Sequence, residues 1–429
     1  MFRRCKVVHQ DVYQHALQPF VSMLRELSFE DHPYRVSPIH MMAACPGLTH
    51  YSYHFSDRPD YHTYSRVSSA VLPDNLQLPI KYLCLDTGSY SDFRLKSVLR
   101  HCPQLACLII NQSVPTTFDL DMCSRLCPQL ECLSFHGVSQ GAKWESYARN
   151  TRRSRGLRHF VSKEIGGYGA RQMVPFLQKH QRTLESIHVD GACRQYAPDQ
   201  ESWSGLGFIH APQLKSVHLT GVVMASEFLG LFLRQSQRLR QLTLYYEQTD
   251  FDSDVADALL TLPALRSLAL SVKRPTVLSS WASDMTLGYA RLFASRQFEK
   301  VSLGDNMLDD QIVGVLCRNL QSLELTHSDC HDTPNLTASH IVQLTALENL
   351  TFRNINSLDD NILLDLSASL ENLKQLVLVG CHSVTDAGLL PFLNGETNVQ
   401  HLTIAKCTSV SQKPHIPFKE CRICISYEQ

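Results

Sequence analysis

The amino-acid sequence predicts an α/β solenoid, in which short parallel strands alternate with returning helices. The first observation is a signature of large hydrophobic residues at positions i, i+3 and i+5, which recurs fifteen times. The second is its spacing, since most intervals between successive signatures are 25 to 27 residues. The third is its context. The signatures alternate apolar with variable residues, as half-buried strands do, and segments with helical spacing follow them.

The first positions of the signatures are distributed along almost the whole chain. They are Leu24, Leu48, Ile80, Leu105, Leu130, Leu157, Leu184, Leu214, Leu239, Leu265, Phe298, Leu320, Leu347, Leu373 and Val399. A period in this range is typical of leucine-rich repeats, in which one unit supplies one strand and one helix and cannot bury its apolar face alone. We therefore expect a leucine-rich-repeat solenoid, a horseshoe of about 15 strand-helix repeats with a parallel concave sheet.

The chain has three predicted parts. Residues 1–23 form an N-terminal lead-in that we expect to be helical, residues 24–410 form the repeat array, and residues 411–429 form a C-terminal capping segment. Intervals of 32 and 33 residues follow Leu48 and Leu265. We interpret them as loops or lengthened helices, because no Gly-, Pro- or Ser-rich linker accompanies them.

The signature that begins at Leu157 is incomplete. Phe160 stands at i+3, but Ser162 stands at i+5, where the other repeats have a hydrophobic residue. A polar residue at a core position breaks the strand pattern, so we expect this strand to be short or distorted.

The repeat that begins at Leu373 shows how the pattern assigns side chains to faces. The positions predicted to point into the solenoid are Leu373, Leu376 and Leu378. The positions predicted to line the concave sheet are Gln375, Val377 and Val379. A helical segment follows, and Thr385 or Asp386 is a suitable residue to cap its first turn.

The composition argues against several classes of function. Lys and Arg total 40 against 41 for Asp and Glu, so no net field attracts the chain to nucleic acid or to anionic lipid. A hydrophobic content of 44% is typical of a folded protein, and no apolar stretch reaches the length of a membrane span. No apolar run of signal-peptide length follows the basic N-terminus, so we expect a cytoplasmic or nuclear protein whose fifteen cysteines are reduced and buried.

Two short motifs recur beside the signatures. The string Cys-Pro-x-Leu stands at 45–48, 102–105 and 127–130, with a variant, Cys-Arg-Asn-Leu, at 317–320. The string Leu-Val-Leu-Val-Gly-Cys-His-Ser-Val-Thr-Asp-Ala-Gly-Leu covers 376–389. Together they resemble the cysteine-containing class of leucine-rich repeat that is found in F-box proteins.

This resemblance implies a function. In F-box proteins of this type the horseshoe binds a substrate, while an N-terminal F-box helix bundle docks on the Skp adaptor of a cullin-based ubiquitin ligase. The present sequence has no recognisable F-box before its first repeat at Leu24. Two interpretations follow: the substrate-recognition part of an SCF-type ubiquitin ligase whose F-box is absent or lost, or a free-standing protein-interaction scaffold unrelated to ubiquitination.

The candidate partner-binding residues lie at outward positions of the predicted concave sheet, in the middle of the array. They are His136, His159, Lys163, His188, Asp190, His218 and Tyr245, with Tyr246 at the rim. Aromatic and polar side chains gathered in a concavity are typical of protein-binding surfaces. A separate basic cluster at Arg152, Arg153 and Arg155 is either a solvated loop or a dock for an acidic segment of a partner.

We predict no catalytic, metal-binding or cofactor-binding residues. The string Gly-Val-Ser-Gln-Gly at 137–141 matches a hydrolase nucleophile elbow, but no partner Asp and His can be assigned to Ser139. Cys421 and Cys424 form only half of a zinc site, and a capping strand explains them better. The expected partner is therefore a protein, with no cofactor.

Overall fold

The computed structural model describes the chain as two compact units. Unit 1 comprises residues 1–201 and 209–214, and unit 2 comprises residues 202–208 and 215–429. The described residues are 4–7, 22–30, 38–54, 73, 75–85, 92–110, 119–135, 156–162, 170–190, 203–222, 224–246, 253–272, 281–305, 307–327, 338–411 and 424–428.

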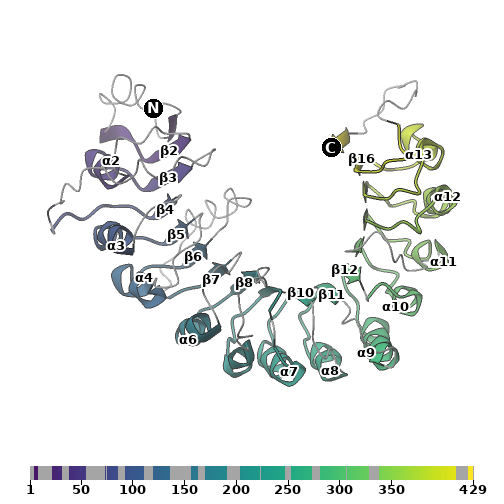
Figure 1. The fold of residues 1–429 in the computed structure, drawn as a ribbon, viewed down its shortest axis with the longest axis horizontal. Helices are drawn as coiled ribbons and strands as arrows, with labels where there is room; N and C mark the ends of the chain where they lie inside the picture. The colour runs from purple at the N-terminus through teal and green to yellow at the C-terminus, as the bar shows by residue number, and fades with distance from the viewer. Residues whose placement is uncertain are drawn as a thin grey trace. The chain divides into compact units, whose positions relative to one another are not determined.

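Unit 1 is a row of parallel strands with helices on one face (Figure 1). Its strands are β1 (Arg4–Val7), β2 (Glu26–Glu30), β3 (His50–His54), β4 (Tyr82–Leu85), β5 (Cys107–Ile110), β6 (Cys132–Phe135), β7 (His159–Ser162) and β8 (Ser186–Asp190). Its helices are α2 (Pro38–Ala44), α3 (Asp92–Arg100), α4 (Leu120–Leu126) and α6 (Ala170–His180). Each strand pairs in parallel with the next one along the chain.

Unit 2 repeats this arrangement. Its strands are β9 (Ser216–Thr220), β10 (Gln241–Tyr246), β11 (Ser267–Val272), β12 (Lys300–Asp305), β13 (Ser322–Thr326), β14 (Asn349–Arg353), β15 (Gln375–Val379), β16 (His401–Ala405) and β17 (Cys424–Glu428). Its helical elements are η6 (Trp203–Phe208), α7 (Ser226–Gln235), α8 (Ser253–Leu260), α9 (Trp281–Ser295), α10 (Asp310–Gly314), α11 (Ala338–Ile341), α12 (Asp360–Ser369) and α13 (Asp386–Leu393). Successive strands are again parallel.

The fold class predicted from the sequence is confirmed, because all fifteen signatures form strands. Each of these strands begins two residues after the first position of its signature. The first positions of all fifteen signatures are at most 5% exposed. Equivalent core residues also pair laterally, as Leu350, Leu376 and Leu402 do in β14, β15 and β16. Burial of one such side chain stabilises the fold by about 1.5–3 kcal/mol, so the leucines form a shared core along the strands.

Two further strands extend the rows. In β1, Cys5 and Val7 pair with Leu27 and Phe29. These two residues stand at i+3 and i+5 from Phe2, so β1 follows the repeat pattern once cysteine is counted as apolar. At the other end, β17 pairs in parallel with β16. The predicted boundaries after residues 23 and 410 stay predictions, and the helix expected before Leu24 lies mostly outside the described residues.

The distortion expected in the strand after Leu157 is not found, although the strand is short. Strand β7 has four residues, as many as β4, β5 and β6. It pairs in register with both neighbours, and Ser162 lies opposite Val189. Ser162 is only 2% exposed, so the smaller side chain is accommodated inside without a change of register.

The repeat at Leu373 has the faces that the sequence predicts. Its three inward leucines are at most 1% exposed, whereas the alternating residues are exposed or half-buried. Thr385 caps α13, because its hydroxyl accepts a hydrogen bond from the Ala387 amide at 3.2 Å. Asp360, at the start of α12, accepts bonds from the Thr385 amide at 2.8 Å and hydroxyl at 2.6 Å. These hydrogen bonds therefore link the first turns of the neighbouring helices α12 and α13.

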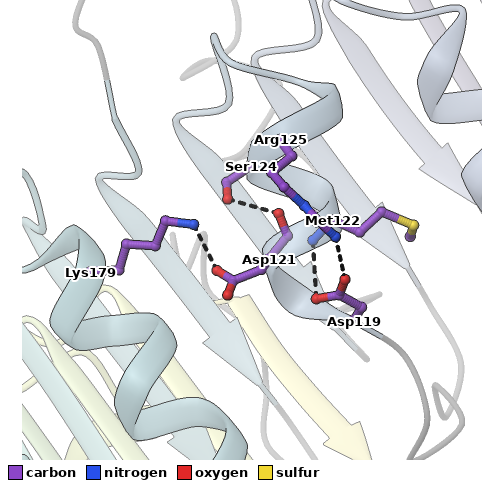
Figure 2. A network of polar contacts seen from close by, with 6 residues as sticks. All are labelled: Asp119, Asp121, Met122, Ser124, Arg125 and Lys179. Carbon is purple, nitrogen blue, oxygen red and sulfur yellow. Dashed lines mark hydrogen bonds and ion pairs between the residues drawn. The ribbon is translucent and has the colours of Figure 1, made fainter.

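A polar contact also joins two helices of unit 1, α4 and α6 (Figure 2). Asp119 caps α4 by accepting from the Met122 amide at 3.2 Å, and it pairs with Arg125 at 2.6 Å. Asp121 in the first turn of α4 pairs with Lys179 of α6 at 2.9 Å. Both side chains of this second pair are about half exposed, at 52% and 49%, so it belongs to the class of weak surface ion pairs.

The chain leaves several strands through a residue with a positive φ. This residue is always the seventh after the first position of the signature, as in Gly221, Asp305, Asn354, Gly380 and Lys406. Glycine, asparagine and aspartate tolerate this left-handed conformation, whereas lysine does so at some cost. Among the described helices, none combines the length and the apolar character that crossing a bilayer would require.

Candidate functional site

Each unit has an inner face, which is the face of its strands opposite the helices. Side chains at the second, fourth and sixth positions after each signature start project from it. These side chains do not pack in the leucine core, so the core does not require them to be apolar. The inner faces of the two units differ in burial and in chemistry.

The inner face of β4 to β7 in unit 1 is closed to solvent. Its residues at the second and fourth positions are all at most 7% exposed: Tyr82, Cys84, Cys107, Ile109, Cys132, Ser134, His159 and Val161. These strands are therefore buried on both faces. The side chains are mostly apolar, as burial requires.

Cysteine thiols form the centre of this closed face. Cys107 and Cys132 lie opposite each other in β5 and β6. A hydrogen bond between the two thiols and burial together raise the pKa of Cys107 well above its ordinary value. Neutral, buried thiols behave as small apolar groups. The ten cysteines whose side chains the structure describes are free thiols, and all are buried except the half-buried Cys317. No group of three or more His, Cys, Asp or Glu in the described ranges is arranged to hold a metal ion.

Only some of the candidate residues of unit 1 lie on the inner face in the described part of the structure. His136 and Lys163 lie outside the described residues, as do Arg152, Arg153 and Arg155 of the basic cluster. His159 is 7% exposed, so its ring is not presented to a partner in this structure. Its Nδ1 instead forms a hydrogen bond with the Ser186 hydroxyl at 3.0 Å. The structure places His188 and Asp190 on the inner face of β8, where both are half-buried.

The inner face of unit 2 is open and mostly polar at the second and fourth positions. The fourth positions of its strands form a continuous row in register, and every member is half-buried: His218, Thr243, Ala269, Ser302, Glu324, Thr351, Val377 and Thr403. Its second positions are half-buried or exposed throughout. Solvent reaches these positions along β9 to β16.

Two candidate residues of unit 2 lie side by side on this face. The rings of His218 and Tyr245 are 6.1 Å apart and meet edge to face at 70°. The His218 Nε2 atom also forms a hydrogen bond with the Thr220 hydroxyl at 2.8 Å. Tyr246 ends β10, and its side chain lies outside the described part of the structure. The pair of rings offers an amphipathic surface of limited flexibility.

Charged residues extend this pair towards β14. Glu324 and Arg353 form an ion pair at 2.8 Å, with side chains 38% and 45% exposed. Burial raises the pKa of Tyr245, and a hydrogen bond with Ser302 opposes this increase. The charges of Glu324 and Arg353 also act on the Tyr245 hydroxyl. We call His218, Tyr245, Ser302, Glu324 and Arg353 the Tyr245 cluster.

Sequence reasoning chose neither Ser302 nor the two charged members of this cluster. Glu324 stands at the fourth position after Leu320, and Arg353 stands at the sixth position after Leu347. The repeat register assigns both to the inner face, so the signal was present in the sequence. It was obscured because the neighbouring strands contribute small residues such as Ser302.

Comparison with known proteins gives likeness of fold only. No protein-family model and no curated protein matches the chain. Among solved structures, a chain from the crystal structure of the Rad7 and Elc1 complex in yeast is similar at a TM-score of 0.43 and 14% identity, covering 82% of this chain and 81% of that one. A chain from the crystal structure of the TLR13-ssRNA13 complex is similar at a TM-score of 0.42 and 16% identity, covering 89% of this chain and 53% of that one.

Proposed function

We propose that this protein is a protein-binding leucine-rich-repeat module, and that its docking surface is the inner face of β9 to β14. The observation that carries the proposal is the contrast in solvent access. At the second and fourth positions, the residues of β4 to β7 are at most 7% exposed, whereas those of unit 2 are half-buried or exposed and mostly polar. A partner can contact only side chains that solvent can reach, so unit 2 is the better platform.

The Tyr245 cluster has the composition of a binding hot spot. Tyrosine and arginine are enriched among residues that dominate protein-protein affinity. Arg353 and Glu324 remain partly solvated as an ion pair, so a partner could engage either charge at modest desolvation cost. His218 and Tyr245 add an aromatic surface beside them. A polypeptide with apolar and charged groups fits this surface.

Variants of the cluster test this proposal. We expect the double change Tyr245→Ala with Arg353→Ala to reduce recovery of the partner from cell extract at least ~10-fold, as the loss of hot-spot residues does. Thr403→Ala changes another half-buried inner-face residue, on β16, and is the matched control. Equal recovery by wild type and the double variant, in a quantitative affinity purification of the full chain, would refute the docking surface.

We further propose that the bound protein is a substrate of an SCF-type ubiquitin ligase. Support comes from the Cys-Pro-x-Leu strings and the 376–389 motif, which resemble the repeats of F-box proteins. On this proposal the protein acts in the cytoplasm or nucleus, and the Skp adaptor and a cullin engage an F-box that is supplied with it. The same purification tests this step through recovery of the Skp adaptor. Recovery of another partner without the adaptor favours the alternative, a free-standing scaffold.

His188 and Asp190 in unit 1 remain candidates on their own strand. Both are half-buried on β8, and Asp190 is its last residue. We expect His188→Ala to weaken partner recovery less than the double change in the Tyr245 cluster, because β8 follows four strands whose inner face is closed. A larger loss for His188→Ala would move the docking surface to unit 1.

A further inference from the structure

We propose that unit 2 carries a second binding site, a row of three basic residues on the rim where its strands begin, which takes an acidic segment of a partner polypeptide. The residues are Lys215, Arg240 and Arg266, which we call the basic row. Each stands directly after the first position of its signature, and each is exposed. The site lies outside the Tyr245 cluster and is formed by a different position of the repeat.

Backbone hydrogen bonds fix the spacing of the basic row. The Arg240 amide donates to the Lys215 carbonyl at 2.8 Å, and the Arg266 amide donates to the Arg240 carbonyl at 2.9 Å. The three residues are therefore lateral neighbours, separated by one strand spacing of about 4.8 Å each. The row extends over about 10 Å, which is the length of about three residues of an extended peptide.

The same repeat position carries paired opposite charges at two other places in the fold. In unit 1, Arg158 lies between Glu131 and Glu185 and pairs with both, with its Nε 2.7 Å from Glu185. In unit 2, Lys374 pairs with its neighbour Glu348 at 2.9 Å. Opposite charges on neighbouring strands stabilise a sheet, and like charges destabilise it. At these two places the position carries opposite charges on neighbouring strands.

The basic row departs from that rule. Lys215 has an interaction of its own. Arg240 stands between two further positive charges, and the fold gains nothing from their repulsion. Arg240 is in the centre, and no ion pair or hydrogen bond of its side chain is found among the described residues. Arg266 has a weak partner in Glu299 at 3.8 Å, and both of these side chains are more than half exposed. An arrangement that costs stability is explained if an anionic partner binds there.

The charge pattern beyond the row identifies the kind of partner. The next strands present Glu299 and Glu348 at the same position, and Glu324 on the inner face. A long polyanion such as nucleic acid would be repelled after about three strands. A short stretch of Asp or Glu residues matches the length of the row, and arginine forms paired hydrogen bonds with carboxylates. The row therefore fits an acidic polypeptide segment.

A peptide titration tests this site. The probe is a fluorescein-labelled peptide of alternating Glu and Gly residues, titrated with the full chain while anisotropy is recorded. We expect binding that weakens as salt increases from about 50 to about 200 mM. Arg240→Glu should weaken it at least ~10-fold, because it reverses the central charge. The matched control is Lys374→Glu, which makes the same change of net charge at the same repeat position and should alter affinity less than ~2-fold.

Three outcomes would overturn the proposal. They are an unchanged affinity for Arg240→Glu, an equal loss for Lys374→Glu, and tighter binding of a labelled single-stranded DNA oligonucleotide that is also lost in Arg240→Glu. The proposal rests on the protein-binding function, but its test is separable. Tyr245→Ala should leave peptide affinity unchanged, so failure of the basic row would not be confused with failure of the inner face.

Thermal stability supplies a second readout. Arg240→Glu places an acid between two bases, as Arg158 is a base between two acids. We expect its Tm to be equal to that of the wild type or higher by about 1 °C, since repulsion is replaced by attraction. A lower Tm, measured by circular dichroism, would contradict the argument that the row is kept at a cost to stability.

Discussion

The inner face of β4 to β7 and the inner face of β9 to β16 are built on the same repeat, yet they differ in their exposure to solvent. Both regions bury the first residue of every signature in the core. On the inner face, the first region presents buried Cys, Ile, Tyr and Val, and the second presents half-buried Ser, Thr, His and Glu. The core positions therefore specify the fold, and the alternating positions specify what the face can contact.

Thiol reactivity should give the largest difference between the two units. A hydrogen bond with the Cys381 side chain lowers the pKa of Cys407, in unit 2, to about 7. Burial and the hydrogen bond with Cys132 raise that of Cys107. Only the thiolate reacts, and Cys407 is 9% exposed while Cys107 is 1% exposed. At neutral pH we therefore expect iodoacetamide to modify native Cys407 faster than Cys107. Peptide mass spectrometry after timed quenching measures both rates.

The pH dependence sharpens this prediction. Because the pKa of Cys407 is about 7, its thiolate fraction should increase between pH 6 and 8 and then level off. Cys381→Ala removes the hydrogen bond and should move the midpoint of this curve towards the ordinary thiol value of 9.0. A midpoint that stays at 7 in this variant would assign the shift to another cause.

Matched valine substitutions should give the next largest effect. Val161 and Val377 occupy the fourth position after their signatures, but Val161 is 4% exposed and Val377 is half-buried. We expect Val161→Ala to reduce the free energy of unfolding by about 2 kcal/mol, because two methyl groups leave a cavity. Val377→Ala should cost about 0.5 kcal/mol. Chemical denaturation of the full chain compares them, and equal losses would show that the two faces are alike in burial.

Whether a feature of this structure could be predicted from the sequence depends on what determines the residue at each repeat position. Leucine at the first position has one stable environment, so its period predicted every one of the fifteen strands and the start of each. The polar residue Ser162 suggested a distorted strand, but strand pairing on both sides keeps β7 in register. Strand β1 escaped notice because Cys5 was not counted as apolar.

The candidate surface was harder to predict, because alternation gives the direction of a side chain but not what covers it. His159 and His218 both point to the inner face, at the second and fourth positions after their signatures, yet one is 7% exposed and the other is half-buried. A signal did exist in the neighbours: Cys107, Ile109 and Cys132 are apolar residues at positions that would otherwise face water. The register of Arg353 predicts that it lies on the inner face. A single residue considered alone, however, gives little reason to choose it as a binding residue.

Polar contacts between successive helices should give a smaller difference between the units. Asp360 accepts two hydrogen bonds from Thr385 and is half-buried, so Asp360→Ala should cost about 1.5 kcal/mol. Asp365→Ala changes an exposed carboxylate of the same helix and serves as the control. A loss for Asp360→Ala no larger than that of the control would mean that this bond does not couple the repeats.

The smallest effect is expected for the exposed ion pair between α4 and α6. Lys179→Ala should cost about 0.5 kcal/mol at low salt, because both Lys179 and Asp121 are about half exposed. The loss should vanish when salt is raised to about 1 M, where screening acts within about 3 Å. Denaturation at both salt concentrations measures it, and a loss that persists at high salt would indicate packing of the lysine stem instead.

The account depends most on the claim that the inner face of unit 2 is open while that of β4 to β7 is closed. Hydroxyl-radical footprinting tests it directly on two tyrosines, Tyr245 in β10 and Tyr82 in β4. Tyr82 is 4% exposed and Tyr245 is half-buried, so we predict that Tyr245 is oxidised several times faster in the native chain. Oxidation of Tyr82 at the same rate as Tyr245, or faster, would contradict the account.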